Sequence, residues 1–158
     1  MSKTGSAALR VLLACFGVGA IAIAAPRAQP DSRPETAIRE ALSKWSSDFN
    51  ARDDSRICDL FARELVYDYR GFPERGYDAL CDLLHRSLRD QTKRFAYSFD
   101  IKEIIASGDI AVVRLVWTLR VTSGAASAVE TREPGLDVFR RQPDGRWKII
   151  RYMGYEAP

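Results

Sequence analysis

The stretch Gly135–Tyr155, GLDVFRRQPDGRWKIIRYMGY, decides the fold of this chain, because it predicts two strands joined by one tight turn. In the turn Gln142–Gly145, the proline presets φ at the second position and the final glycine accepts a left-handed backbone. Side chains alternate along the strand that follows, so Trp147 and Ile149 are expected to share the face that packs against helices.

The strand before this turn carries the one carboxylate with a functional argument. Asp137 and Phe139 share a face, and Leu136 and Val138 share the opposite one, so an acid lies beside an aromatic ring on a half-buried strand. Two interpretations stay open. Asp137 is solvated or paired with a neighbouring arginine, as strand carboxylates usually are, or it points into a protected site.

The N-terminus has the composition of an export signal. Lys3 and Arg10 precede the apolar run Val11–Ala25, which is rich in Ala and Gly and is followed by prolines. Positive charge, apolar length and a small-residue end are typical of a secretory signal peptide, and the run is shorter than the ~20 residues of a membrane span. We therefore predict a signal peptide at residues 1–24, with an uncleaved anchor as the alternative.

The remainder predicts one exported domain. Residues 25–33 form a Pro-rich polar linker, and residues 34–158 are long enough for a hydrophobic core of their own. We expect the protein in the periplasm or secreted, with membrane contact only through the leader. The formal net charge of +3 falls to +1 without Lys3 and Arg10, and this small excess argues against nucleic acid as a partner.

Cys58 and Cys81 are the cysteines of the expected mature chain. A pair in an exported protein favours a disulfide, and two small buried thiols are the alternative. The single histidine, His85, lies at the edge of an apolar helix stripe and cannot by itself build a His-rich metal site. We predict neither a metal ion nor another cofactor.

Three helices are expected in the N-terminal half. The first opens at Pro34 and carries Trp45 and Phe49 on its apolar face, where they belong to the core or line a pocket. The second is predicted at Ser55–Phe61, and the third runs from Asp78 to about Asp90.

The strands follow from alternation and turn residues. In Leu65–Arg70, Tyr67 and Tyr69 share one face and Asp68 lies on the other. In the strand that begins at Phe95 the alternation breaks at Glu103–Ile105, which predicts a bulge.

The longest strand is predicted at Ile110–Thr122, and a polar strand at Ala128–Glu133 ends in a kink at Pro134–Gly135. Helices followed by consecutive strands predict an α+β domain with a mostly antiparallel sheet. The bulge and the kink would curl that sheet around a cavity.

This order of elements resembles the SnoaL-like, nuclear-transport-factor-2-like (NTF2-like) superfamily, which includes ketosteroid isomerases and polyketide cyclases. The segments that carry the resemblance are FNARDDSRICDLFARELVYDYRG, ERGYDALCDLL and GLDVFRRQPDGRWKIIRY. The resemblance implies a cone, in which a curved sheet and three helices enclose a pocket. It also implies a possible homodimer through the sheet.

Three positions correspond to ketosteroid isomerase chemistry, in which one Asp moves a proton while a Tyr and a protonated Asp hold the developing oxyanion. Asp137 matches the late-strand acid and Trp45 matches the tyrosine of the first helix. Tyr69 matches the first-strand base, and Asp68 is adjacent but one residue off, which reverses the face.

Two functions are therefore expected. The first is an exported pocket domain that binds a small hydrophobic molecule without defined catalysis, lined by the aromatic residues Trp45, Phe49, Tyr67 and Phe139. The alternative is a ketosteroid-isomerase-like enzyme or cyclase that abstracts a proton α to a carbonyl, with Asp137 as acid and Tyr69 or Asp68 as base.

Overall fold

The computed structural model describes residues 33–124 and 126–158. The predicted signal peptide and all of the predicted linker except Arg33 lie outside the described residues. The described residues cluster as one compact unit.

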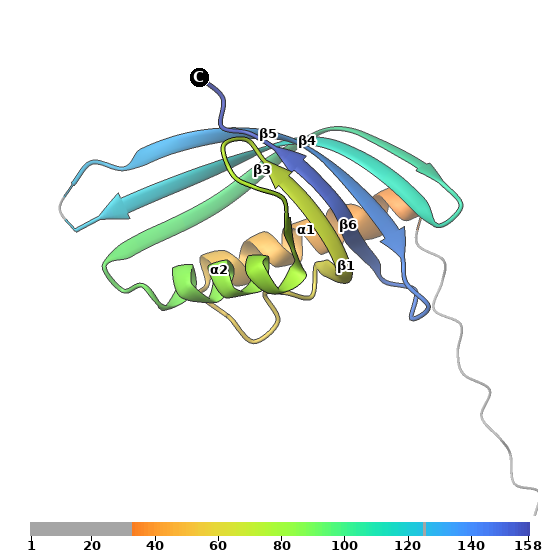
Figure 1. The fold of residues 1–158 in the computed structure, drawn as a ribbon, viewed down its shortest axis with the longest axis horizontal. Coiled ribbons are helices and arrows are strands. Elements are labelled where there is room, and N and C mark those ends of the chain that lie inside the picture. Colours follow the sequence, from red (N-terminus) through yellow and green to blue (C-terminus); the bar gives the residue numbers. More distant parts are fainter. Residues whose placement is uncertain (1–32, 125) are drawn as a thin grey trace, which may run out of the picture. The chain divides into compact units, whose positions relative to one another are not determined.

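Two helices and six strands make up this unit. In chain order they are α1 (Pro34–Asn50), β1 (Phe61–Tyr69), β2 (Arg75–Gly76), α2 (Tyr77–Arg89), β3 (Lys93–Ser107), β4 (Ile110–Ser123), β5 (Val129–Arg141) and β6 (Trp147–Gly154). The strands form one sheet in the order β2-β1-β6-β5-β4-β3. Figure 1 shows this sheet arching over α1 and α2, which lie on its concave side. The predicted α+β fold with a curved sheet is confirmed.

Antiparallel pairing dominates the sheet, with one exception. β3, β4, β5 and β6 pair antiparallel in chain order, whereas β1 pairs parallel with β6. The parallel pair places Tyr67 opposite Tyr152 and Tyr69 opposite Gly154, residues more than eighty positions apart in the chain. The sheet is therefore mixed, and this one pairing joins the first half of the chain to the last strand.

The hairpin between β5 and β6 forms as predicted. The Gly145 amide donates to the Gln142 carbonyl at 2.8 Å, and Gly145 has φ +84°, the left-handed region that favours glycine. Trp147 and Ile149 are buried on the helix side of the sheet. The predicted bulge in β3 is confirmed, since the register with β4 shifts between Ile101 and Glu103.

The predicted helix at Ser55–Phe61 is wrong. This segment consists of turns, and Phe61 already begins β1. The Asp53 carboxylate accepts hydrogen bonds from the Ser55 amide at 3.1 Å and the Ser55 hydroxyl at 2.6 Å, which closes a local turn instead of capping a helix. A helix this short has little intrinsic stability, so two helices rather than three cover the sheet.

The predicted kink at Pro134–Gly135 does not divide the strand. β5 runs unbroken through both residues, and Pro134 pairs with Val116 while Gly135 pairs with Leu115. The alternation of side chains is therefore continuous from Val129 to Val138, and this continuity decides which residues of β5 reach the interior.

Candidate functional site

A cavity of about 380 Å³ lies on the helix side of the sheet, lined by residues of α1, α2 and all six strands together with Leu60 in the turn before β1 and Phe72 in the loop after it. Its wall is mainly aromatic and aliphatic: Trp45, Leu60, Phe61, Tyr67, Tyr69, Phe72, Leu80, Leu83, Leu84, Tyr97, Trp117, Ile149 and Tyr152. Three charged residues complete the lining: Arg75, Glu133 and Asp137. This composition suits a small, largely apolar molecule held by a few polar groups.

Asp137 is the most deeply buried charged residue of the site. It lies on β5 opposite Val113 of β4 and Tyr152 of β6, and only 1% of it is exposed. Neither carboxyl oxygen has a hydrogen-bond partner within the described part of the chain. Asp137 is therefore neither solvated nor paired with an arginine, which decides between the two interpretations of the sequence.

Loss of hydration on burial raises the pKa of Asp137 to about 8. The carboxyl is thus mainly protonated at neutral pH and can donate a hydrogen bond. A buried polar group without a partner costs about 1–3 kcal/mol of stability, and such groups concentrate at functional sites. A ligand with a hydrogen-bond acceptor at this position would supply the partner that the Asp137 carboxyl lacks.

Tyr152 lies across two glycines next to Asp137. A Cβ at Gly154 would come within 2.8 Å of the Tyr152 Cζ, and one at Gly135 within 3.4 Å of its Cε2. Gly135 and Gly154 are paired across β5 and β6, so the absence of both side chains makes a seat for the ring on the sheet. The ring stacks with Tyr67 at a centroid separation of 5.8 Å, and the buried Tyr67 hydroxyl also lacks a partner among the described residues.

Glu133 is a second carboxyl group in the cavity, and the sequence analysis did not single it out. It lies four residues before Asp137 on the same face of β5, opposite Trp117, and is only partly buried. Burial is the main cause that raises the pKa of Glu133, while a hydrogen bond with Tyr69 acts in the opposite direction. The predicted kink hid this residue, because a broken strand does not carry the alternation from Asp137 back to Glu133.

The structure separates the two candidate bases. Tyr69 lines the cavity, but burial, followed by the charge of Glu133, raises its pKa to about 12, so it stays protonated at neutral pH. Asp68 is exposed and lies outside the cavity lining, since adjacent strand residues face opposite sides. Neither residue is placed as a base: Tyr69 has the wrong protonation state and Asp68 the wrong location.

Of the four predicted lining aromatics, the structure brings Trp45 and Tyr67 to the cavity and leaves Phe49 and Phe139 in the surrounding core. Phe49 stacks on Trp45 with ring centroids 5.4 Å apart, and Phe139 is fully buried on β5, between β4 and β6. The Trp45 indole donates to the Ile57 carbonyl at 2.9 Å, so it does not serve as an oxyanion donor.

The cavity opens beside α2. Phe72 and Leu83 line it although 57% and 41% of these residues are exposed, so they form its rim. The Arg75 guanidinium lies 5.0 Å from the centre of the Phe72 ring, as in a cation–π contact. The position of Leu83 at the rim explains why this leucine is exposed.

Cys58 and Cys81 form a disulfide with Cα atoms 5.7 Å apart. The bond ties the turn before β1 to α2, two segments that flank the cavity. His85 lies beside it, with Nε2 3.8 Å from the Cys58 Sγ and Nδ1 3.6 Å from Asp54 Oδ2. Among the described residues no group of three His, Cys, Asp or Glu side chains is placed to hold a metal ion, and none of the helices is long and apolar enough to cross a membrane.

Two comparisons with known proteins, one with protein families and one with solved structures, agree with this fold. The family described as the SnoaL-like domain matches residues 42–150. A conserved protein from Planctomyces limnophilus is similar in structure with a TM-score of 0.71 and 22% identity, over 78% of this chain and 96% of that one. No curated protein matches.

Two further solved structures share the fold. A ketosteroid isomerase-like protein from Erwinia carotovora atroseptica has a TM-score of 0.64 and 23% identity, over 80% of this chain and 100% of its own. An NTF2-like protein with a cystatin-like fold from Novosphingobium aromaticivorans has a TM-score of 0.64 and 20% identity, over 77% and 80%. At these identities the likeness concerns the fold.

Proposed function

Since the chain belongs to the SnoaL-like domain family, whose fold serves many unrelated functions, we propose a function from the site itself: the cavity binds a small hydrophobic molecule that carries a carbonyl group. The neutral carboxyl of Asp137 donates a hydrogen bond to that carbonyl. The aromatic and aliphatic wall supplies most of the affinity through burial of apolar surface.

The observation that carries the proposal is the lone buried acid. Asp137 has no partner for either oxygen among the described residues, and it lines an apolar cavity. A protonated carboxyl in such a place matches a ligand that accepts one hydrogen bond and has little other polarity. A carboxylate ligand fits less well, because it would meet the partly buried Glu133 in the same cavity.

The alternative is an enzyme that abstracts a proton α to the carbonyl. In this alternative Asp137 would supply the acid, and the lack of a suitable base is the obstacle. Tyr69 has its pKa raised to about 12 and Asp68 lies outside the cavity lining. The Cα atoms of Glu133 and Asp137 are about 13 Å apart along β5, and the Tyr152 ring covers Gly135, which lies between them. A base must reach within hydrogen-bond distance of its proton, so the geometry favours binding.

We also propose that the protein works outside the cytoplasm. The export signal predicted at residues 1–24 and the Cys58–Cys81 disulfide both support this location. Detection of the mature chain in a periplasmic or culture fraction would test it.

The proposal is tested with 2-acetylnaphthalene, a two-ring ketone, and 2-ethylnaphthalene, which lacks the acceptor. Fluorescence titration at pH 6.5 should show about tenfold tighter binding of the ketone, the effect of one buried hydrogen bond. Asp137→Leu should abolish that difference and leave 2-ethylnaphthalene binding unchanged. The ketone affinity of the wild type should fall as pH rises through about 8, because the ionised carboxyl no longer donates.

Asp137→Asn is the matched variant, since its amide keeps a neutral donor at all pH values. It should bind the ketone without the loss at high pH. Equal affinity of the wild type for the ketone and the hydrocarbon would refute the hydrogen bond, and no binding of either would refute the apolar pocket. Circular dichroism confirms that each variant is folded.

A further inference from the structure

Glu133 gives the cavity a second polar end. We infer that the ligand is an elongated molecule with two polar ends: a carbonyl that meets Asp137 in the deep part, an apolar body, and a hydroxyl group that donates a hydrogen bond to Glu133. This inference rests on the proposed function, because it takes the carbonyl at Asp137 as given and adds the opposite end.

The spacing of the two acids follows from the strand. Glu133 and Asp137 are four residues apart on one face of an unbroken strand, which places their Cα atoms about 13 Å apart. Both acids line the same cavity. A hydrogen bond of about 2.7 Å at each end leaves roughly 8 Å between the two polar atoms of the ligand. Two fused six-membered rings with substituents at opposite ends have this length.

The floor between the acids is apolar and flat. Gly135 is the only inward-facing residue of β5 between them, and the Tyr152 ring lies over it, 3.4 Å from the position a Cβ would take. Burial is the main cause that raises the pKa of Tyr152, and the charges of Glu133 and Asp137 add to it, as expected for a ring that lines the same cavity as both acids. A planar apolar body can stack on this ring while its ends reach the two carboxyl groups.

Glu133 is suited to accept a hydrogen bond from a ligand. No lysine or arginine contributes to its pKa shift, and the described part of the chain contains no salt bridge to it. The Tyr69 hydroxyl forms a hydrogen bond with it and so acts as a positioning residue. Glu133 retains acceptor capacity for a second donor, since a carboxylate has about four lone-pair sites.

The experiment compares 6-acetyl-2-naphthol with 2-acetylnaphthalene by fluorescence titration at pH 6.5. In the wild type the added hydroxyl should tighten binding by about tenfold, as expected for a hydrogen bond to a carboxyl group in a protected site. Glu133→Leu should remove this gain, so that it binds 6-acetyl-2-naphthol and 2-acetylnaphthalene with equal affinity. Glu130→Gln is the control, since Glu130 is exposed on the opposite face of the same strand.

Each outcome decides one point. A tenfold gain in the wild type and in Glu130→Gln, lost in Glu133→Leu, supports the second polar end. No gain in the wild type, or a gain that survives Glu133→Leu, overturns the inference while leaving the ketone site intact. Failure of 2-acetylnaphthalene itself to bind refutes the proposed function instead. The shorter 4-hydroxyacetophenone should gain nothing over acetophenone, because one ring does not span both acids.

Discussion

At the scale of single residues, the short side chain of Asp137 and the absence of side chains at Gly135 and Gly154 shape the site. Asp137 is short, so its carboxyl stays against the sheet, where burial keeps it protonated at neutral pH. Gly135 and Gly154 lack side chains, so the Tyr152 ring lies on the strands beside it. Together these residues place one hydrogen-bond donor, the protonated carboxyl of Asp137, within an apolar and aromatic surface.

Burial of Asp137 predicts a dependence of stability on pH. The folded protein keeps the Asp137 proton up to about pH 8, whereas the unfolded chain releases it near about pH 4. The contribution of this group is complete below about pH 4 and is lost as pH rises to about 8, by up to about 1.4 kcal/mol per pH unit. The free energy of unfolding can be measured by urea unfolding between about pH 5 and 8. It should fall with this slope in the wild type and not in Asp137→Asn.

The matched control for this measurement is Asp68→Asn, which changes an exposed carboxyl on β1. It should keep the slope of the wild type. The same slope in Asp137→Asn would mean that another group causes it.

At the scale of elements, the turn segment between α1 and β1 has three roles. It contributes Ile57 to the core, its Ile57 carbonyl accepts the Trp45 indole hydrogen bond, and Cys58 anchors it to α2. A regular helix here would have used the Ile57 carbonyl within the helix itself. The irregular segment therefore fixes the orientation of Trp45 in the cavity wall.

The disulfide should contribute measurably to stability. It closes a loop with a sequence separation of 23 residues, and the chain-entropy relation gives about 3 kcal/mol for a loop of this length. We expect Cys58→Ser/Cys81→Ser to lose about this much free energy of unfolding, and the oxidised protein to gain the mass of two hydrogen atoms on reduction. The dithiol-treated wild type is the control and should match the double variant. Equal denaturation midpoints of oxidised and reduced protein would contradict the expectation.

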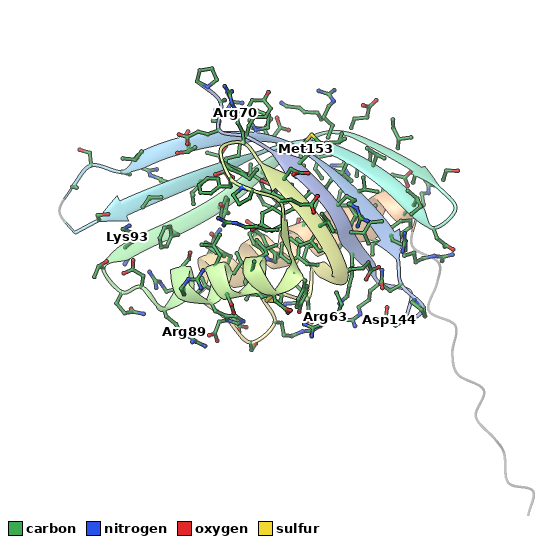
Figure 2. All side chains as sticks on the ribbon, in the orientation of Figure 1. Arg63, Arg70, Arg89, Lys93, Asp144 and Met153 are labelled. Carbon is green, nitrogen blue, oxygen red and sulfur yellow. A yellow bond between two sulfur atoms is a disulfide. The ribbon has the colours of Figure 1, made fainter. Side chains whose placement is uncertain are left out.

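At the scale of the whole molecule, the outer face of the sheet carries exposed apolar side chains. Leu136 and Met153 are direct neighbours on β5 and β6 and are 43% and 61% exposed. Figure 2 shows Met153 on the side of the sheet away from the helices. Val112 and Val138 pair on the same face in a half-buried position. A patch of this kind is expected at a protein interface, and the homodimer through the sheet remains our proposal.

The proposed dimer is tested by light scattering after gel filtration. Leu136→Glu/Met153→Glu should convert a dimer into a monomer, because two like charges per subunit would be buried in the interface. Val129→Glu is the control, since Val129 is 65% exposed at the far end of β5. A wild type that elutes as a monomer would refute the interface. Ligand binding should be unaffected in Leu136→Glu/Met153→Glu, because Leu136 and Met153 lie on the face opposite the cavity.

The sequence by itself determined what depends on local periodicity. Alternation put Asp137 on the same face as Phe139, and Tyr67 and Tyr69 on the face opposite Asp68, and turn chemistry predicted the hairpin at Gln142–Gly145. These features follow from residues within a few positions of each other, so they can be predicted without the tertiary structure.

Only the tertiary structure decided which inward residues meet. The parallel pairing of β1 with β6 sets Tyr67 beside Tyr152, the unbroken β5 carries Glu133 into the cavity with Asp137, and the Ile57 carbonyl accepts the Trp45 hydrogen bond. The raised pKa of Asp137 likewise arises from the elements packed around it. Pairing, hydrogen-bond choice and desolvation depend on partners distant in the chain, whereas period-two alternation reports only the face on which a side chain lies.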